Sequence, residues 1–219
     1  MGLFFYDVKG ALVHKSQIHD NASYGIDVHD DSEGSLFSEN RIWNNGNHGL
    51  ILSKRCTRNI IARNVIYDHT SRVKDYFIHG IMLHESSNDN LVWDNTLWNN
   101  YNGINIHASH NTVVAMNSIL SDREHGMKLW AVSNGNLFLM NSVQRSNKYD
   151  IRIESSSQNV FLGSSIEDGG ISFTNSAENV FIIDAMPKVI RNGEGNILIQ
   201  HANPLAYYLA MHNGFRLDF

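Results

Sequence analysis

Tyr24, Asp27 and His29 bring a phenol, a carboxyl group and an imidazole together within six positions. If the segment is a β-strand, its side chains alternate between two faces, so Asp27 and His29 share one face about 6.6–6.8 Å apart and Tyr24 lies where the strand starts. Imidazole suits proton transfer because its ordinary pKa lies near neutral pH, whereas a phenol acts as a base only when its pKa is lowered. The spacing therefore predicts an acid–base site whose three groups one ligand unit can contact.

These residues lie in one copy of a repeat in which a glycine is followed by alternating apolar residues. Successive copies start 20 to 24 residues apart, except for one interval of 31 residues between Gly49 and Gly80. Because a coil of this length cannot bury its own apolar face, stacked coils about 4.8 Å apart are needed to form a core. The copies start at Gly2, Gly25, Gly49, Gly80, Gly103 and Gly126, with weaker copies at Asp150 and Gly170.

The repeat predicts an all-β fold: a single-stranded right-handed parallel β-helix, or β-solenoid, with coils of about 23 residues. We expect a single domain over residues 1–219 that lacks upstream coils, because the chain begins inside a repeat. Residues 185–219 are expected to form an irregular last coil and a tail over the open end. A leucine-rich repeat is disfavoured because neither its Leu-x-x-Leu-x-Leu skeleton nor its helix is evident.

Asparagines flank a second set of apolar runs between the glycine copies. At a turn, asparagine tolerates unusual backbone angles, and its amide can bond to the coil above. We therefore expect a ladder of stacked side chains at one corner of the solenoid, made by Asn40, Asn64, Asn95, Asn117 and Asn141.

The outward strand positions form columns of polar and aromatic side chains. Such a groove suits a sugar chain, because hydroxyl groups need convergent donors and acceptors while a tryptophan ring offers an apolar face. Ordinary solvation of exposed strand positions is the simpler alternative. The candidate substrate contacts are Asp30, His48, Lys54, Arg55, His79, His84, Asn105, His107, His125, Lys128 and Trp130.

The histidine columns could instead hold a metal. His48 and His79, helped by His29 or His84, are the candidates. Stacked histidines alone give no fixed coordination motif, so no metal site is predicted.

The interval of 31 residues adds a loop near residues 68–78, with Arg72, Lys74 and Tyr76 beside the groove. Insertions on a binding face often contact the ligand, so this loop could clamp a substrate. A surface loop without function explains it equally well.

The chain of 219 residues carries a net charge of −5, which argues against non-specific binding to nucleic acid or a membrane surface. An anionic ligand would therefore need a local basic patch. Cys56 is the only cysteine, so there is no intramolecular disulfide and no cysteine metal cluster. No apolar run approaches the ~20 residues of a membrane span. These features leave oligomeric state and cellular location open.

The segment Tyr24-Gly-Ile-Asp-Val-His-Asp30 resembles the Tyr-Gly-(Ile/Phe)-Asp-Pro-His-(Asp/Glu) signature of mannuronan C5-epimerases. The coils at His48-Gly-Leu-Ile-Leu-Ser and from Gly80 to Asn95 are similar to the periplasmic bacterial branch of that family. The resemblance covers approximately residues 2–130. Val28 replaces the proline of the signature.

The resemblance implies conversion of β-D-mannuronate to α-L-guluronate within alginate, by removal of the C5 proton and reprotonation from the opposite face. It makes His29 and Tyr24 the acid–base pair, in either order, and Asp27 the group that neutralises or positions the uronate carboxylate. The implied partner is an anionic polysaccharide, and the implied location is periplasmic or extracellular. Ser53 and Lys54 stand where calcium-dependent relatives carry an acidic residue, so no cofactor is expected and Ca²⁺ is unsupported.

Two other functions stay open. A polysaccharide lyase would abstract the same proton and then expel the 4-linked sugar, on the same kind of fold. A non-catalytic β-helix would bind glycan without chemistry. A hydrolase is disfavoured because no pair of carboxylates stands out across the groove.

Overall fold

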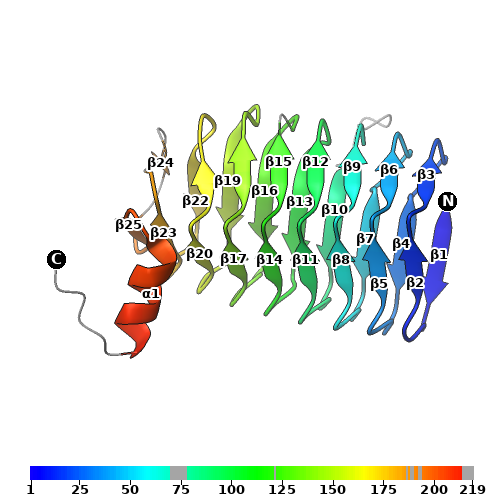
Figure 1. Cartoon of the computed structure of the whole chain (residues 1–219), viewed down its shortest axis with the longest axis horizontal. Helices are drawn as coiled ribbons and strands as arrows, with labels where there is room; N and C mark the ends of the chain where they lie inside the picture. The colour runs from blue at the N-terminus through cyan, green and yellow to red at the C-terminus, as the bar shows by residue number, and fades with distance from the viewer. Residues whose placement is uncertain (70–77, 121, 186, 188–189, 192–193, 214–219) are drawn as a thin grey trace.

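The computed structural model describes residues 1–69, 78–120, 122–185, 187, 190–191 and 194–213. Within these residues, short parallel strands stack along one axis and form three sheets (Figure 1). In the described residues, seven coils add one strand to each sheet in the same order, and the last two add strands to the first and second sheets alone. Neighbours within a sheet therefore come from successive coils. The architecture is the parallel β-solenoid that the repeat predicts.

The first sheet contains the strands that follow the repeated glycines. Ile26 pairs with Leu50 and His29 pairs with Ser53, as the alignment of the copies predicts. The register continues from Leu50 to Ile81, so the longer interval does not shift the next coil. The strands are β1 (Leu3–Tyr6), β4 (Ile26–His29), β7 (Leu50–Ser53), β10 (His79–His84), β13 (Asn102–His107), β16 (His125–Trp130), β19 (Tyr149–Glu154), β22 (Ile171–Thr174) and β24 (Ile190–Arg191).

The second and third sheets complete each coil with strands that are mostly three residues long. The second contains β2 (Leu12–His14), β5 (Leu36–Ser38), β8 (Ile60–Ala62), β11 (Leu91–Trp93), β14 (Val113–Ala115), β17 (Leu137–Leu139), β20 (Val160–Leu162), β23 (Val180–Ile183) and β25 (Ile197–Gln200). The third contains β3 (Gln17–His19), β6 (Arg41–Trp43), β9 (Val65–Tyr67), β12 (Thr96–Trp98), β15 (Ser118–Leu120), β18 (Ser142–Gln144) and β21 (Ser165–Ile166).

The core is a continuous column of aliphatic and phenylalanine side chains between the sheets. Ile26 and Val28 are fully buried, so the alternate residues of β4, Asp27 and His29, must point outward. Phe138, Phe161 and Phe181 stack at 4.1 and 4.2 Å between ring centroids in successive coils. Packing of this kind fixes the register, because a slip of one residue would expose every apolar side chain.

The predicted asparagine ladder is present at the corner between the second and third sheets. From Asn64 to Asn141, each Oδ1 of the ladder accepts bonds of 2.9–3.0 Å from the backbone N–H and the side-chain amide of the ladder asparagine one coil before. The residue before each ladder asparagine has a positive φ between 48° and 57°. The ladder therefore satisfies buried polar groups at a turn whose backbone conformation is unfavourable for most residues.

The expectation of an irregular segment after residue 184 is wrong for three parts of it, the first of which is the short strand β24. Residues 197–200 form β25, and residues 204–213 form the helix α1 (Pro204–Asn213). Asn203 caps the helix, since its Oδ1 accepts a 3.1 Å bond from the N–H of Ala206, and Pro204 occupies the first helical position. The Asn-Pro pair is a helix-start signal in the sequence, but the prediction followed the glycine repeat, which does not extend to these residues.

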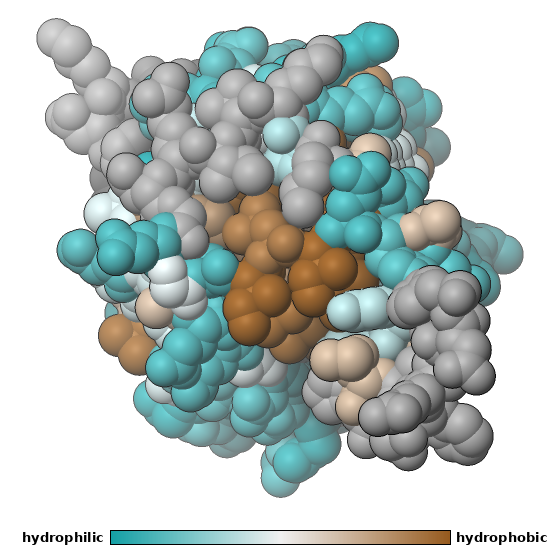
Figure 2. All heavy atoms as spheres, turned by 90° about the vertical axis from the view of Figure 1, so that its left-hand side faces the viewer, coloured by the Kyte–Doolittle hydropathy of each residue, from teal (hydrophilic) through white to brown (hydrophobic). Residues whose placement is uncertain are grey.

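The tail does not simply close the end of the core. Helix α1 contacts β20 and β23 and therefore lies against the outer face of the second sheet. Viewed from this end, an apolar patch is visible at the surface (Figure 2). In the described chain, no helix is long and apolar enough to cross a membrane.

Replacing Asn95 by alanine should destabilise the solenoid by about 2–4 kcal/mol, because the bonds from the Asn64 backbone and amide and to the Ile61 carbonyl would all be lost. Urea unfolding should show a lower midpoint for this variant. The exposed Asn147→Ala is the matched control and should keep the wild-type midpoint. Equal midpoints for both variants would contradict a stabilising ladder.

Candidate active site

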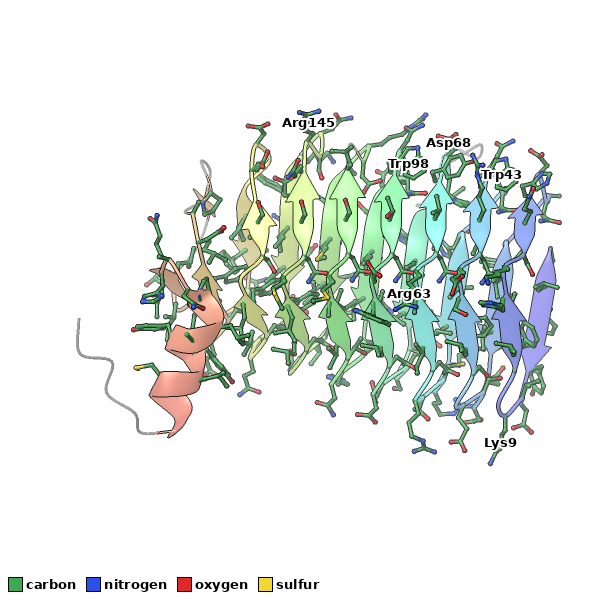
Figure 3. All side chains as sticks on the ribbon, viewed as in Figure 1. Lys9, Trp43, Arg63, Asp68, Trp98 and Arg145 are labelled. Carbon is green, nitrogen blue, oxygen red and sulfur yellow. The ribbon has the colours of Figure 1, made fainter. Side chains whose placement is uncertain are left out.

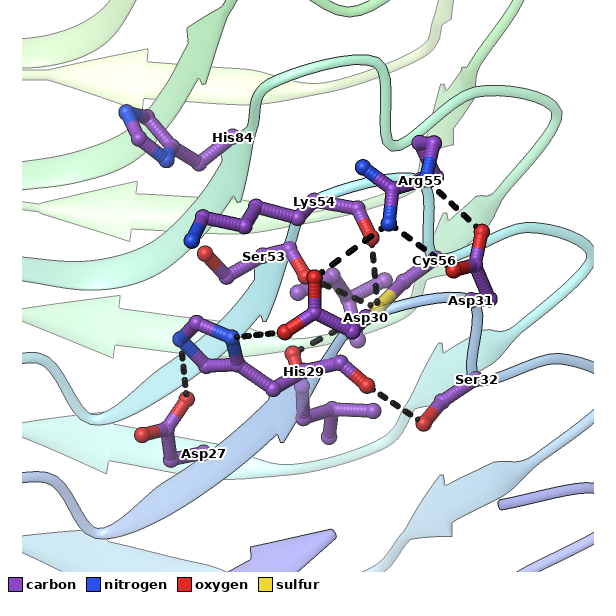
Figure 4. Close-up of polar contacts among 12 residues, drawn as sticks. Asp27, His29, Asp30, Asp31, Ser32, Ser53, Lys54, Arg55, Cys56 and His84 are labelled. Atoms are coloured by element: carbon purple, nitrogen blue, oxygen red, sulfur yellow. Dashed lines mark hydrogen bonds and ion pairs between the residues drawn. The ribbon is translucent and has the colours of Figure 1, made fainter. Parts of the chain in front are cut away.

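Asp27 and His29 point to the same side of β4, as the alternation predicts. The Oδ1 atom of Asp27 lies 3.8 Å from Nε2 of His29 (Figure 4). The side chain of His29 is 27% exposed, whereas that of Asp27 is only 4% exposed. The pair therefore forms one unit in which the imidazole is at the surface and the carboxyl group lies beneath it.

The other nitrogen of His29 is held by the turn that follows the strand. Nδ1 lies 3.0 Å from Oδ2 of Asp30. The bond from His29 holds the pKa of the Asp30 carboxyl below its usual value, and the charges of Lys54 and Arg55 act in the same direction. An ionised Asp30 can only accept, so Nδ1 carries a proton, and in the neutral form of the imidazole Nε2 has a lone pair toward the face that contains Asp27.

The turn itself explains why Arg55 reaches this carboxylate. Asp30 and Asp31 have φ values of 39° and 59°, and Lys54 and Arg55 adopt 61° and 63° one coil later. Because both turns have the same shape, Arg55 is placed directly over Asp31 and donates two bonds of 2.8 Å to it. A further bond of 3.3 Å reaches Asp30. Arg55 thus orients the carboxylate that orients His29.

Asp27 is unusual among these groups because its Oδ1 is buried without a hydrogen-bond partner in the described part of the chain. Burial raises the pKa of this carboxyl group, and the nearby His29 only partly opposes the effect. An unpaired buried carboxylate is costly, so the group favours its protonated form or a donor supplied by a ligand. A protonated Asp27 can itself donate a hydrogen bond.

Tyr24 lies just before β4, in the column that continues with His48 in the next coil. It is half-buried, and its ring centroid is 5.6 Å from that of His48. Along the chain, Tyr24 precedes β4 and His29 ends it, so Asp27 lies between them in the sequence of the strand.

Three of the predicted substrate contacts, His48, His79 and His125, are between 4% and 9% exposed. Burial lowers their pKa values, to about 3 for His48, about 4 for His125 and well below the ordinary value for His79. The three rings are therefore neutral, and they pack below the surface of the first sheet. Direct contact between these rings and a ligand stays a prediction.

Asn105 is also buried, and it connects this layer to the surface. Its Oδ1 accepts a 2.9 Å bond from Nε1 of Trp130, and its Nδ2 lies 3.0 Å from Nε2 of His79. The bond fixes the orientation of the indole ring. Asn105 therefore acts on the surface through Trp130, which the residue type alone did not indicate.

The more exposed predicted contacts continue the surface across successive coils. His84 stacks on His107 at 4.6 Å, and His107 lies 4.2 Å from Trp130, measured between ring centroids. Lys128 lies over the Trp130 ring at 4.8 Å and pairs with Glu154 at 3.6 Å. With His29 and Ser53 this column crosses five strands, about 19 Å at ~4.8 Å per strand. It forms an extended face rather than a closed pocket.

Metal ligands do not gather at this face. In residues 1–69, 78–120 and the other described segments, no group of three histidine, cysteine or acidic side chains could hold a metal ion. Arg72, Lys74 and Tyr76, the predicted clamp, lie outside the described residues.

The coils and their polar face define a protein of the parallel β-helix class. The chain belongs to the family described as right handed beta helix region, whose model matches residues 1–119. It also falls within a second family, described as periplasmic copper-binding protein (NosD), by a match over residues 69–192. These matches confirm the predicted fold and its handedness.

The chain is also similar to mannuronan C5-epimerases. It is 27% identical over 130 residues to the enzyme of Pseudomonas putida, covering 58% of this chain and 24% of the relative. It is 30% identical over 117 residues to mannuronan C5-epimerase AlgG of Azotobacter vinelandii, covering 45% and 22%. The resemblance seen in the signature is therefore confirmed. The chain spans about a quarter of the length of these curated relatives.

Solved structures of two epimerases share the fold. The crystal structure of the periplasmic alginate epimerase AlgG superposes with a TM-score of 0.70 at 21% identity, covering 91% of this chain and 47% of that one. The A-module of the Azotobacter vinelandii mannuronan C-5 epimerase AlgE6 gives 0.71 at 14% identity, covering 90% and 62%. At these identities the likeness establishes the solenoid alone.

Asp27→Asn should stabilise the protein at pH 7 by about 1–3 kcal/mol, because the amide removes the cost of a buried carboxylate with an unpaired oxygen. Since the folded pKa of Asp27 lies above the ordinary 3.8, the native state holds the proton more tightly than the unfolded chain. Wild-type stability therefore falls as pH rises from 3.8 through the folded pKa, and the advantage of the variant should shrink toward acid pH.

Denaturant unfolding across the pH range checks this effect. The exposed Asp89→Asn should leave stability unchanged at each pH. A destabilised Asp27→Asn at neutral pH would show that the carboxylate is well paired in the folded protein.

Proposed function

We propose that this protein is an isomerase that converts β-D-mannuronate to α-L-guluronate within alginate by inverting C5. The observation that carries the proposal is the Asp27–His29 unit, exposed on one face of β4 within a signature that resembles that of C5-epimerases. The proposed ligand is an anionic polysaccharide lying along the first sheet.

The chemistry requires a base for the C5 proton and an acid on the opposite face of the sugar ring. His29 is the proposed base, because Nδ1 is held by Asp30 and, in the neutral imidazole, Nε2 has a lone pair on the open side. Tyr24 is the proposed acid, because it lies just before β4, at the opposite end of the strand from His29. After each turnover, solvent must remove the proton from His29 and return one to Tyr24.

Asp27 is proposed to stabilise the negative charge that this reaction creates. Loss of the C5 proton places negative charge beside the uronate carboxylate, and an ionised carboxyl group nearby would oppose it. A protonated Asp27 can instead donate a hydrogen bond to that carboxylate, a contribution of ~3–4 kcal/mol for one well-placed donor. The buried, unpaired Oδ1 supports this role.

Basic side chains along the same face support binding of neighbouring uronate units. Lys54 is exposed beside the His29 turn, and Lys128 and Arg152 lie on the strands β16 and β19. Glu154 contacts Lys128 at 3.6 Å and Arg152 at 3.9 Å, so a uronate carboxylate must compete with Glu154 for these two cations. The similarity to a periplasmic epimerase supports action in the periplasm or outside the cell.

The direct test is incubation of mannuronan with the protein in deuterated water, followed by NMR. Guluronate signals and deuterium at C5 are expected. His29→Gln should slow both by at least ~100-fold because the general base is lost. His14→Gln is the matched control, since His14 lies on the second sheet, bonded to Ser38, and should retain the wild-type rate.

Three outcomes would refute the proposal. Folded wild-type protein could produce neither signal, or His29→Gln could retain the rate. Alternatively, absorbance from unsaturated uronates would show that the protein is a lyase, in which the same proton abstraction is followed by elimination.

Treatment with a chelator followed by dialysis is expected to leave the epimerisation rate unchanged. The reason is that Ser53 and Lys54 stand where calcium-dependent relatives carry an acidic residue. Restoration of a lost rate by added Ca²⁺, but not by Mg²⁺, would contradict this prediction.

A further inference from the structure

The outer face of the second sheet is apolar along the length of the solenoid. In each of its nine strands the first and third residues point outward, because the residue between them lies in the core. Only His14 and Ser38 are polar among these outward positions in the described strands. Strands that are apolar on both sides are typical of parallel sheets buried on both faces. This face therefore requires a cover.

Part of the face is open to solvent and hollowed. Leu12 is 67% exposed, Leu36 is 36% and Ile60 is 38%. Together with Leu91 and Trp93 they line a groove of about 530 Å³ over β2, β5, β8 and β11. Apolar surface of this kind marks a site of association.

The other end of the same face is covered by the chain itself. Helix α1 contacts β20 and β23, and the outward side chains Leu162 and Ile182 of these strands are each only 3% exposed. In Figure 1 the helix lies in front of this end of the sheet. The fold thus shows which element covers the apolar face: a short apolar helix.

Helix α1 has apolar surface left over. Its sequence, Pro-Leu-Ala-Tyr-Tyr-Leu-Ala-Met-His-Asn, contains no charged residue. Leu205, Leu209 and Met211 are 41%, 49% and 66% exposed although α1 is packed on the sheet. Helices that are apolar all round are normally buried, so α1 has a second apolar side without a partner in the described chain.

The positions of these two surfaces are self-complementary. In the second sheet the groove spans strands one to four, and α1 lies over strands seven and eight. A two-fold axis over the fifth strand, β14, brings the helix of one copy onto the groove of the other, and the reverse. We propose that two copies associate antiparallel through this face, with each α1 filling the groove of its partner.

The rim of the groove is compatible with a second copy. Arg63, labelled in Figure 3, pairs with Asp94 at 3.5 Å and lies over the Trp93 ring at 4.6 Å, so its charge is already compensated. Glu39 pairs with Lys15 at 3.6 Å on the same rim. Two neutralised rims can meet without the repulsion that like charges would cause.

The available area also favours a helix-mediated contact. The whole outer face of the second sheet, including the part under α1, measures only roughly 380 Å², for nine strands ~4.8 Å apart and three residues of ~3.3 Å. This is about half of the ~800 Å² that each partner buries in a standard interface. The exposed side of α1 must therefore contribute, which makes the helix essential to the contact.

Sedimentation of the full chain over a range of concentrations tests the proposal. The expected species is a dimer of twice the 24.8 kDa chain. Ile60→Lys in the groove and Leu209→Lys on the helix should each give monomer with unchanged circular dichroism and melting temperature. Leu120→Lys is the matched control, because Leu120 is also 38% exposed but lies on the third sheet, and it should remain a dimer.

Cross-linking distinguishes this contact from any other dimer. The native Cys56 is buried, so introduced cysteines are the reactive ones. Mixed Ile60→Cys and Leu209→Cys proteins should form a mixed pair with a short bismaleimide, whereas neither variant alone should cross-link. Wild-type monomer at every concentration, a dimer resistant to both lysine variants, or growth into larger species would overturn the proposal.

Discussion

The alignment of each coil with the next is the constraint on which the rest of this structure depends. Backbone hydrogen bonds between parallel strands set a spacing of ~4.8 Å, so residues about 23 positions apart become neighbours in space. Any side chain is then surrounded by the equivalent residues of the coils before and after. The apolar core, the asparagine ladder and the polar face are three results of this one rule.

The candidate site uses the rule to bring charges together without sequence proximity. Arg55 lies 24 positions after Asp31 and becomes its partner because two turns of identical shape stack. Asp27 is buried because strands close on either side of it, with Phe4 as its partner in β1 and Ile51 in β7. Burial of the Asp27 carboxyl group beside His29 is unfavourable, and the free energy of packing the surrounding apolar core offsets this cost.

Much of the fold was predictable because the periodicity of the sequence is redundant. The six clear glycine copies gave the register of the first sheet, and the flanking asparagines gave one ladder. A further ladder, from Asn136 through Asn159 and Asn179, was not foreseen, since Thr112 interrupts it. Helix α1 was missed because it lies beyond the repeat and is specified by its cap and not by a period.

The sequence predicted which face of the strand the site residues occupy, but not how deeply their side chains are buried. Alternation correctly placed Asp27 and His29 on one face. It could not show that His48, His79 and Asn105 would be buried, because burial on an outward face depends on the size of side chains in neighbouring coils. For the same reason the apolar outer face of the second sheet became evident only when the nine strands were aligned.

Burial raises the pKa of the Asp27 carboxyl group beside His29, and we propose that this group meets the uronate carboxylate. Carbon-13 NMR of the Asp27 carboxyl group, assigned with Asp27→Asn and titrated with and without oligomannuronate, tests it most directly. We predict a titration midpoint above the ordinary 3.8 in the free protein and a further rise with ligand. A midpoint at or below that value, or one that the ligand lowers, would contradict the account.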